Sequence, residues 1–172
     1  MAPGAEDVAP GRVLVAEDEE HLGTLLAQFL RGRGLDVTLV RDGAAAVAEL
    51  AGGKFDAAVV DVQMPGADGF AVLTAVAGLA RPAEVIIASG NGTRETALAA
   101  LRGGAYATVA KPYRMAEVEL VVRRAVEVRR LRDTVLRLQR ECETLRAEVE
   151  RRGPAPPSAA RGGTNDAGDA PA

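Results

Sequence analysis

Cysteine and histidine are scarce in this chain of 172 residues, which contains one of each. The single cysteine, Cys142, excludes a disulfide framework within one chain. The single histidine, His21, excludes histidine-cluster zinc sites and most histidine-based catalytic triads, and we assign it no role. Any chemistry must therefore rest on carboxylates, hydroxyls and lysine.

Long apolar runs are also missing, as is an excess of basic residues. No stretch approaches the roughly 20 apolar residues of a membrane span, and the first seven residues, MAPGAED, lack the basic and apolar regions of a secretory signal. A formal net charge of −3 gives no general attraction to nucleic acid or to an anionic membrane. We therefore expect a cytoplasmic protein with one folded domain.

Composition divides the chain into four regions. Residues 1–10 form a leader rich in Pro, Gly and Ala that we expect to be flexible, and residues 11–125 carry the pattern of a folded domain. Residues 126–152 continue the last helix of that domain. Residues 153–172 are again rich in Pro, Gly and Ala and cannot form a core, so we expect them to be disordered and to hold no effector domain.

Five short apolar runs alternate with helical patterns in the second region. The runs cover residues 13–16, 37–40, 57–60, 85–88 and 107–110. They show little alternation of polar and apolar residues, as expected for parallel strands that helices cover on both faces. The clearest helical pattern has apolar residues at positions 22, 25, 26, 29 and 30. The chain is therefore predicted to be an α/β protein with a flavodoxin-like (βα)5 doubly wound parallel sheet.

Polar side chains follow the predicted strands at the points where ligands bind in open parallel sheets. The first strand is followed by Glu17, Asp18 and two more glutamates, and the third ends at Asp61. Ser89 ends the fourth strand, and Lys111 follows the fifth. We expect an acidic cluster flanked by a hydroxyl and an ammonium group.

Such a cluster suits Mg²⁺ and phosphoryl transfer. Neighbouring carboxylates repel one another, and a divalent cation with oxygen ligands removes that cost. Phosphoryl transfer then needs mainly positioning and charge neutralisation. Asp61 can act as the nucleophile, while Lys111 pairs with the transferred group and Ser89 donates a hydrogen bond to it.

Four motifs together resemble the receiver domains of two-component response regulators, over roughly residues 12–124. They are 13–20 (VLVAEDEE), 61–69 (DVQMPGADG), 89–90 (SG) and 111–112 (KP). The resemblance implies that Asp61 accepts phosphate from a histidine kinase. It also implies that Glu17, Asp18, Asp61 and the backbone carbonyl of Gln63 hold Mg²⁺, and that Ser89 and Lys111 sense the phosphoryl group.

Two positions depart from this family's pattern. Thr108 stands where the family usually has an aromatic residue that reports the state of the hydroxyl, so the switch, which we place at Ser89 and Thr108, must work differently. Tyr106 is a partial substitute for the missing ring. Glu17 replaces the more common aspartate, and we expect Mg²⁺ binding to survive this change.

Other interpretations of these residues fit less well. Carboxylates at 17–20 alone fit a solvated helix start, and Asp68 with Gly69 fits a turn and helix cap. A nucleotide or flavin site needs glycines and backbone N–H groups after the first strand, whereas this chain has carboxylates that repel an anion. An EF-hand across 61–69 fails on ligand spacing.

Residues 115–152 contain no glycine or proline and predict one long helix that ends before Gly153-Pro154. Within it, apolar residues recur at alternating steps of three and four, with valine at a and leucine at d, which favours a parallel two-stranded coiled coil. This seam comprises Val128, Leu131, Val135, Leu138, Cys142, Leu145 and Val149. Two pairs of opposite charges would attract each other between the chains: Glu127 with Arg132, and Glu141 with Arg146. A helix folded back on the domain is the alternative.

Five arginines between 123 and 132 raise the question of DNA binding, but interspersed acids and the lack of aromatic residues favour a solvated helix face. Our leading hypothesis is a response regulator in a phosphorelay. It would signal through a downstream protein partner, without a DNA-binding or enzymatic output domain, and catalyse at most its own phosphotransfer and dephosphorylation. The alternative is a phosphorylation-independent scaffold or dimerisation module.

Overall fold

The computed structural model describes residues 9–90 and 92–153. Most of the expected leader and nearly all of the expected tail lie outside these residues. Contacts divide the chain into two units, one up to Val135 and one from Leu136 onward, and each is described by itself.

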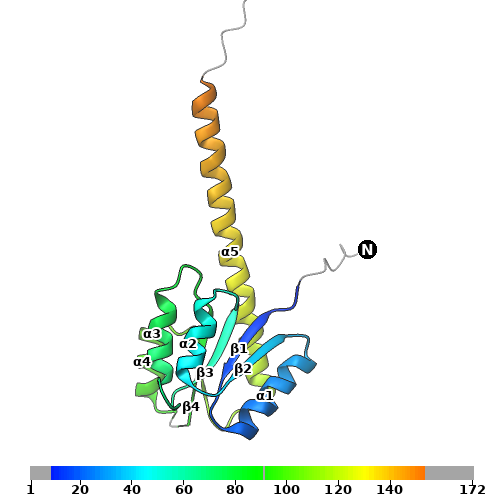
Figure 1. Cartoon of the computed structure of the whole chain (residues 1–172), viewed down its shortest axis with the longest axis vertical. Helices are drawn as coiled ribbons and strands as arrows, with labels where there is room; N and C mark the ends of the chain where they lie inside the picture. The colour runs from blue at the N-terminus through cyan, green and yellow to red at the C-terminus, as the bar shows by residue number, and fades with distance from the viewer. Residues whose placement is uncertain (1–8, 91, 154–172) are drawn as a thin grey trace, which may run out of the picture. The chain divides into compact units, whose positions relative to one another are not determined.

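One sheet of five parallel strands forms the first unit, in the order β2-β1-β3-β4-β5 (Figure 1). The strands are β1 (Arg12–Ala16), β2 (Asp36–Val40), β3 (Ala57–Asp61), β4 (Glu84–Ser89) and β5 (Ala107–Ala110). The helices are α1 (Glu20–Gly32), α2 (Gly43–Ala51), α3 (Gly69–Ala77), α4 (Arg94–Arg102) and α5 (Met115–Arg152). The predicted flavodoxin-like (βα)5 fold is confirmed.

Helices cover both faces of the sheet, and each face carries its own apolar cluster. Val59 and Ile86 belong to the cluster that α1 and α5 cover, whereas Val60 and Ile87 belong to the cluster that α2, α3 and α4 cover. Every residue of β3 and β4 is buried. This two-sided burial explains why the strand sequences show little alternation.

Side-chain caps fix the starts of three helices. Asp42, Asp68 and Thr93 each accept a hydrogen bond from the backbone N–H three residues later, at 2.8, 2.7 and 3.2 Å. Each such cap contributes about 1 kcal/mol and sets the residue at which its helix begins. Asp68 therefore has the capping role that its sequence context suggests.

The first part of α5 packs against the sheet beyond the expected domain boundary at 125. Val118, Val122 and Val126 are buried in the core, and Arg129 is only 3% exposed. Asp133 lies two turns of helix past Ala125, and its carboxylate still forms an ion pair with Arg81, at 2.7 Å. The contacts of the folded domain thus continue to Asp133.

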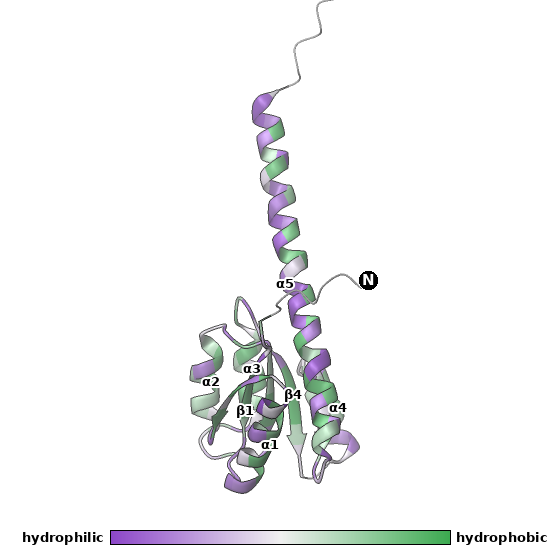
Figure 2. Cartoon of the chain, turned by 90° about the vertical axis from the view of Figure 1, so that its right-hand side faces the viewer, coloured by the Kyte–Doolittle hydropathy of each residue, from purple (hydrophilic) through white to green (hydrophobic). Residues whose placement is uncertain are grey.

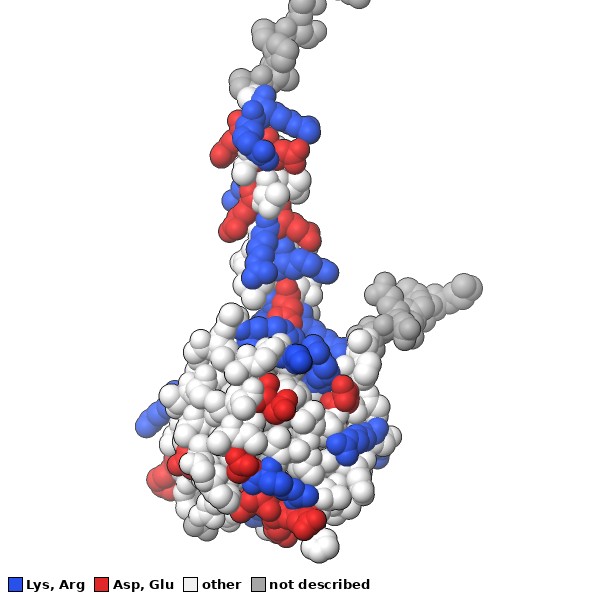
Figure 3. Space-filling model, viewed as in Figure 1, with Lys and Arg blue, Asp and Glu red and all other residues white. Residues whose placement is uncertain are grey.

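Beyond Val135, α5 continues as an exposed helix. Apolar and polar residues alternate along it (Figure 2), and basic and acidic side chains are interleaved (Figure 3). Leu138, Leu145 and Val149 are 51%, 60% and 69% exposed. No helix in the described part of the chain is both long enough and apolar enough to cross a membrane.

Candidate functional site: a carboxylate cluster at the strand ends

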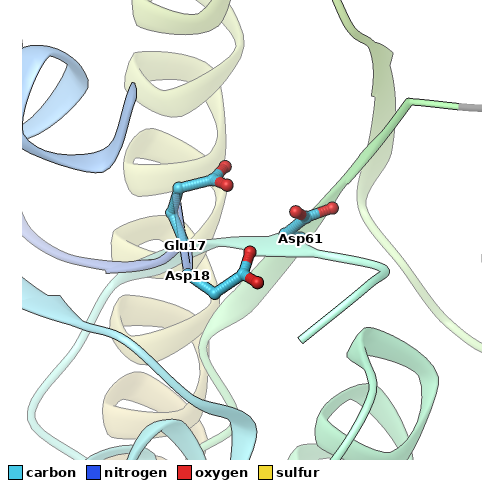
Figure 4. Close-up of side chains that lie close together, drawn as sticks. All are labelled: Glu17, Asp18 and Asp61. Carbon is cyan, nitrogen blue, oxygen red and sulfur yellow. The ribbon is translucent and has the colours of Figure 1, made fainter. Parts of the chain in front are cut away.

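Three carboxylates meet where β1 and β3 end. These strands are neighbours in the sheet, so Glu17 and Asp18, which follow β1, lie beside Asp61, the last residue of β3. Each of the three offers one carboxylate oxygen, and these oxygens lie within 4.8 Å of one another (Figure 4). The order of strands thus assembles a set of hard oxygen donors from residues more than 40 positions apart.

Lys111 reaches this cluster from the end of β5. Its Nζ lies 2.7 Å from Asp61 Oδ2 and 2.7 Å from Glu17 Oε2. The side chains of Glu17 and Asp61 are 3% and 8% exposed, so the ammonium group is their main source of positive charge. In this arrangement the lysine bridges the two buried acids.

Burial and charge shift the protonation of both partners. Burial raises the pKa of Glu17 above 4.5, and the neighbouring Asp61 carboxylate raises it further, although Lys111 opposes the shift. Burial alone would lower the pKa of Lys111, but its hydrogen bonds to Asp61 and Glu17 outweigh this and raise it. The lysine is therefore held in its charged form, while the glutamate carries an electrostatic cost that a bound cation would relieve.

The loop after β3 is packed closely against Asp61. The backbone N–H of Gln63 donates to Asp61 Oδ1 at 3.3 Å, which places Gln63 beside the cluster. Gly69 packs so tightly that a Cβ at this position would come within 2.5 Å of the Asp61 carbonyl oxygen. Glycine is required here because the helix α3 starts against the backbone of the candidate nucleophile.

Ser89 ends β4, and Thr108 lies in β5, the neighbouring strand of the sheet. Ser89 is 6% exposed, and its carbonyl accepts a hydrogen bond from the Lys111 N–H at 2.8 Å. Thr108 pairs with Ile87 in the sheet, and its side chain and that of Ser89 line one cavity of about 140 Å³. Tyr106 packs against the cluster that α1 and α5 cover, away from Val60 and Ile87.

Tyr113, two residues after Lys111, was not predicted from the sequence to belong to the site. Its hydroxyl is buried, without a hydrogen-bond partner among the described residues. Burial, and next the charge of Glu17, raise the pKa of Tyr113 to about 12. The phenol thus stays neutral beside the acidic cluster. Its place in a Lys-Pro-Tyr sequence was the one available signal.

Comparison with known proteins decides the family. The family model described as the response regulator receiver domain matches residues 13–123, well over half of the chain. The chain belongs to this family. Receiver domains are the phosphoacceptors of two-component systems, and they bind Mg²⁺ through acidic residues. The three carboxylates here fit that ion, because Mg²⁺ prefers oxygen ligands.

Curated relatives are longer than this chain. The transcriptional regulatory protein TcrA of Mycobacterium tuberculosis is 38% identical over 107 residues, which cover 62% of this chain and 42% of TcrA. The nitrogen assimilation regulatory protein NtrX of Azorhizobium caulinodans is 30% identical over 156 residues, which cover 83% of this chain and 34% of NtrX. The match thus spans less than half of each relative.

Solved structures match the receiver as well. NtrX from Brucella abortus has a TM-score of 0.67 at 30% identity, and the match covers 75% of this chain and 29% of NtrX. The signal receiver domain of a putative Luxo repressor protein from Vibrio parahaemolyticus has a TM-score of 0.69 at 26% identity. That match covers 73% of this chain and 97% of the Vibrio chain, so it includes nearly the whole of that receiver domain.

Proposed function

We propose that this receiver accepts a phosphoryl group on Asp61 from a histidine kinase and passes the signal on through protein contacts. One observation carries the proposal: Asp61 shares a cluster with two further carboxylates while a lysine ammonium lies 2.7 Å from its Oδ2. A nucleophile, a cation site and a fixed positive charge are what phosphoryl transfer to a carboxylate needs.

Each residue has a part in the proposed reaction. Glu17, Asp18, Asp61 and the carbonyl of Gln63 would hold Mg²⁺, which neutralises charge on the phosphoryl oxygens. A carboxylate oxygen of Asp61 attacks phosphorus, the bond to the kinase histidine nitrogen breaks, and an acyl phosphate forms. Lys111 then turns from the free carboxylates to the phosphoryl oxygens as a point charge.

The Ser89 hydroxyl would complete the site by donating a hydrogen bond to the new phosphoryl group. Ser89 is suited to this because it ends β4, whose Ala88 pairs with Asp61 in the sheet. Its movement toward the phosphoryl group would change the packing around Thr108 and α4, and so the surface offered to a partner.

Mass spectrometry tests the phosphorylation. Incubation of the intact chain with acetyl phosphate and Mg²⁺ is expected to add the mass of one phosphoryl group, and a chelator should prevent the addition. Asp61→Asn should abolish it. Asp68→Asn is the matched control, because Asp68 lies in the same loop but caps α3, and asparagine caps about as well. An Asp61→Asn variant that still gains the phosphoryl mass would refute the proposal.

We also propose that the exposed apolar seam of α5 forms a parallel coiled coil with a second copy. Leu131, Leu138 and Leu145 are each more than half exposed in the single chain, at the d positions of successive heptads. Glu141 lies where it would face Arg146 of the second copy. Burying these leucines is the driving force for the association.

Cross-linking through Cys142 tests the orientation. Cys142 is exposed at an a position, and a positions face each other in a parallel dimer but not in an antiparallel one. Mild oxidation should therefore give a disulfide-linked dimer at twice the chain mass of 17.8 kDa. Cys142→Ser should give none under the same conditions.

Light scattering provides the independent check. Leu138→Asp combined with Leu145→Asp should give a monomer, because the two charges would lie in the seam. Arg140→Asp combined with Ala147→Asp is the matched control, since both residues occupy the outward f positions and should leave the dimer intact. A wild-type protein that is monomeric at micromolar concentration contradicts the proposal.

A phosphorylation-independent scaffold is the second candidate, and Thr108 favours it, because this position offers no ring to report on Ser89. Full activity of an Asp61→Asn variant in cells would support the scaffold. We do not propose DNA contact by the α5 arginines: several already form ion pairs within the chain, such as Arg129 with Asp133 and Arg132 with Glu84.

A further inference from the structure

A cavity of about 140 Å³ lies between β4, β5 and α4, beside the phosphoacceptor site. Its walls come from both strands and the helix. They include Ile87, Ser89, Thr96, Ala97, Thr108 and Val109. The function proposed above repacks some of these walls but assigns the cavity no ligand.

Small side chains on facing elements leave the cavity open. Thr108 and Ala110 on β5 face Ala97 and Thr96 on α4, and none of them reaches across. The floor is rigid, because Ile87 is 1% exposed in the core and pairs with Thr108 in the sheet. The cavity is therefore set by the packed strands, so a ligand would enter a space that already exists.

The size and chemistry of the cavity fit one aromatic ring. An apolar cavity of roughly 150 Å³ is large enough to bind benzene. Here Ile87, Ala97 and Ala110 supply apolar walls, while Ser89 and Thr108 supply hydroxyls that can bond a polar group on the ring edge. We propose that this cavity is a binding site for a single aromatic ring with a polar edge, of which phenol is the simplest example.

Such a ligand would contact Ser89, and this gives the site a link to Asp61. Ser89 follows Ala88, which pairs with Asp61 in the sheet. A ring in the cavity would hold the serine side chain from one side while the phosphoryl group attracts it from the other. This link rests on the proposed function, whereas binding of the ring does not.

Methyl NMR tests the binding directly in the full-length, unphosphorylated chain. Phenol should cause saturable shifts of the Ile87, Ala97 and Ala110 methyl signals, with a dissociation constant on the order of 1 mM. Thr108→Phe, which places a ring in the cavity, should weaken binding at least about tenfold. Ala97→Leu should do the same from the helix side, which covers the case that the first variant does not fold.

Thr74→Phe is the matched control, because Thr74 is exposed on α3 and the same ring there should leave phenol binding unchanged. Asp61→Asn should also bind phenol like wild type, so failure of this site and failure of phosphorylation are distinguishable. N-acetyltyrosinamide is the second probe: if it binds too, a partner's tyrosine can supply the ring, and if only phenol binds, the ligand is a free small molecule. Shifts that do not saturate, or binding that survives in both cavity variants, overturn the proposal.

Discussion

Replacing Lys111 with methionine is expected to lower the free energy of unfolding of the metal-free protein by about 3 kcal/mol and to slow phosphorylation of Asp61 about 100-fold. The stability loss follows from burial. The side chains of Glu17 and Asp61 are 3% and 8% exposed, and the ammonium group lies 2.7 Å from an oxygen of each. Methionine keeps the apolar stem but leaves two buried carboxylates facing each other.

Metal and pH should both modulate this loss in a defined direction. Millimolar Mg²⁺ should restore much of the stability, because a divalent cation replaces the missing charge. The pKa of Glu17 is raised above 4.5 in the folded chain, so the stability associated with its protonated form is present below 4.5 and is lost as pH rises through the folded value. Lys111 opposes the rise in the pKa of Glu17. The loss of stability in the methionine variant should therefore be small in acid, where the carboxylates are protonated, and should grow toward neutral pH.

Urea unfolding with and without Mg²⁺ measures the stability, and acetyl phosphate kinetics measures the rate. Lys54→Met is the control, because Lys54 is the only other lysine in the sequence and its side chain is exposed. That variant should match wild type in both assays. If the Lys111 variant unfolds at the same urea concentration as wild type at neutral pH, the lysine does not balance the two acids.

The sheet and the site residues were predictable because both follow from short-range patterns. A run of buried residues such as those of β3 shows in the sequence as an unbroken apolar stretch, and strand ends in a parallel sheet meet at one edge. Asp61, Ser89 and Lys111 could thus be placed together without knowing any distance. The contact between Lys111 and Glu17 was not predicted, since the residue types alone do not say which acid a lysine will bind.

The charged contacts at the other edge of the sheet were also not predictable. Arg81 and Asp133 are separated by 52 positions, and neither stands out in its local sequence. The arginines of α5 look like a solvated face, yet Arg129 is 3% exposed and donates to the Pro82 carbonyl at 3.0 Å. Only the path of the long helix across the sheet brings these residues together, and periodicity gives no information on that path.

Replacing Arg81 with methionine is expected to lower the free energy of unfolding by about 2 kcal/mol. Its guanidinium lies 2.7 Å from Asp56 and 2.7 Å from Asp133, and it also donates to the Phe55 carbonyl at 2.6 Å. Burial lowers the pKa of Arg81, but the hydrogen bonds to Asp56 and Asp133 outweigh that effect and raise it. Removing one partner of a buried pair costs about 3 to 5 kcal/mol, and the 29% exposure of Arg81 reduces that figure through solvent screening.

Hydrogen exchange in α5 distinguishes the loss of the contact between Arg81 and Asp133 from a general loss of stability. In this variant Asp133 would lose its partner Arg81. Relative to wild type, hydrogen exchange of the backbone amides should therefore speed up more in residues 126–133 than in residues 118–122 of the core. Arg152→Met is the matched control, because within residues 9–90 and 92–153 Arg152 pairs only with Glu148, in an exposed i,i+4 bridge that contributes well under 1 kcal/mol. Equal stability and equal exchange in the Arg81 and Arg152 variants would show that the contact between Arg81 and Asp133 does not hold α5 on the domain.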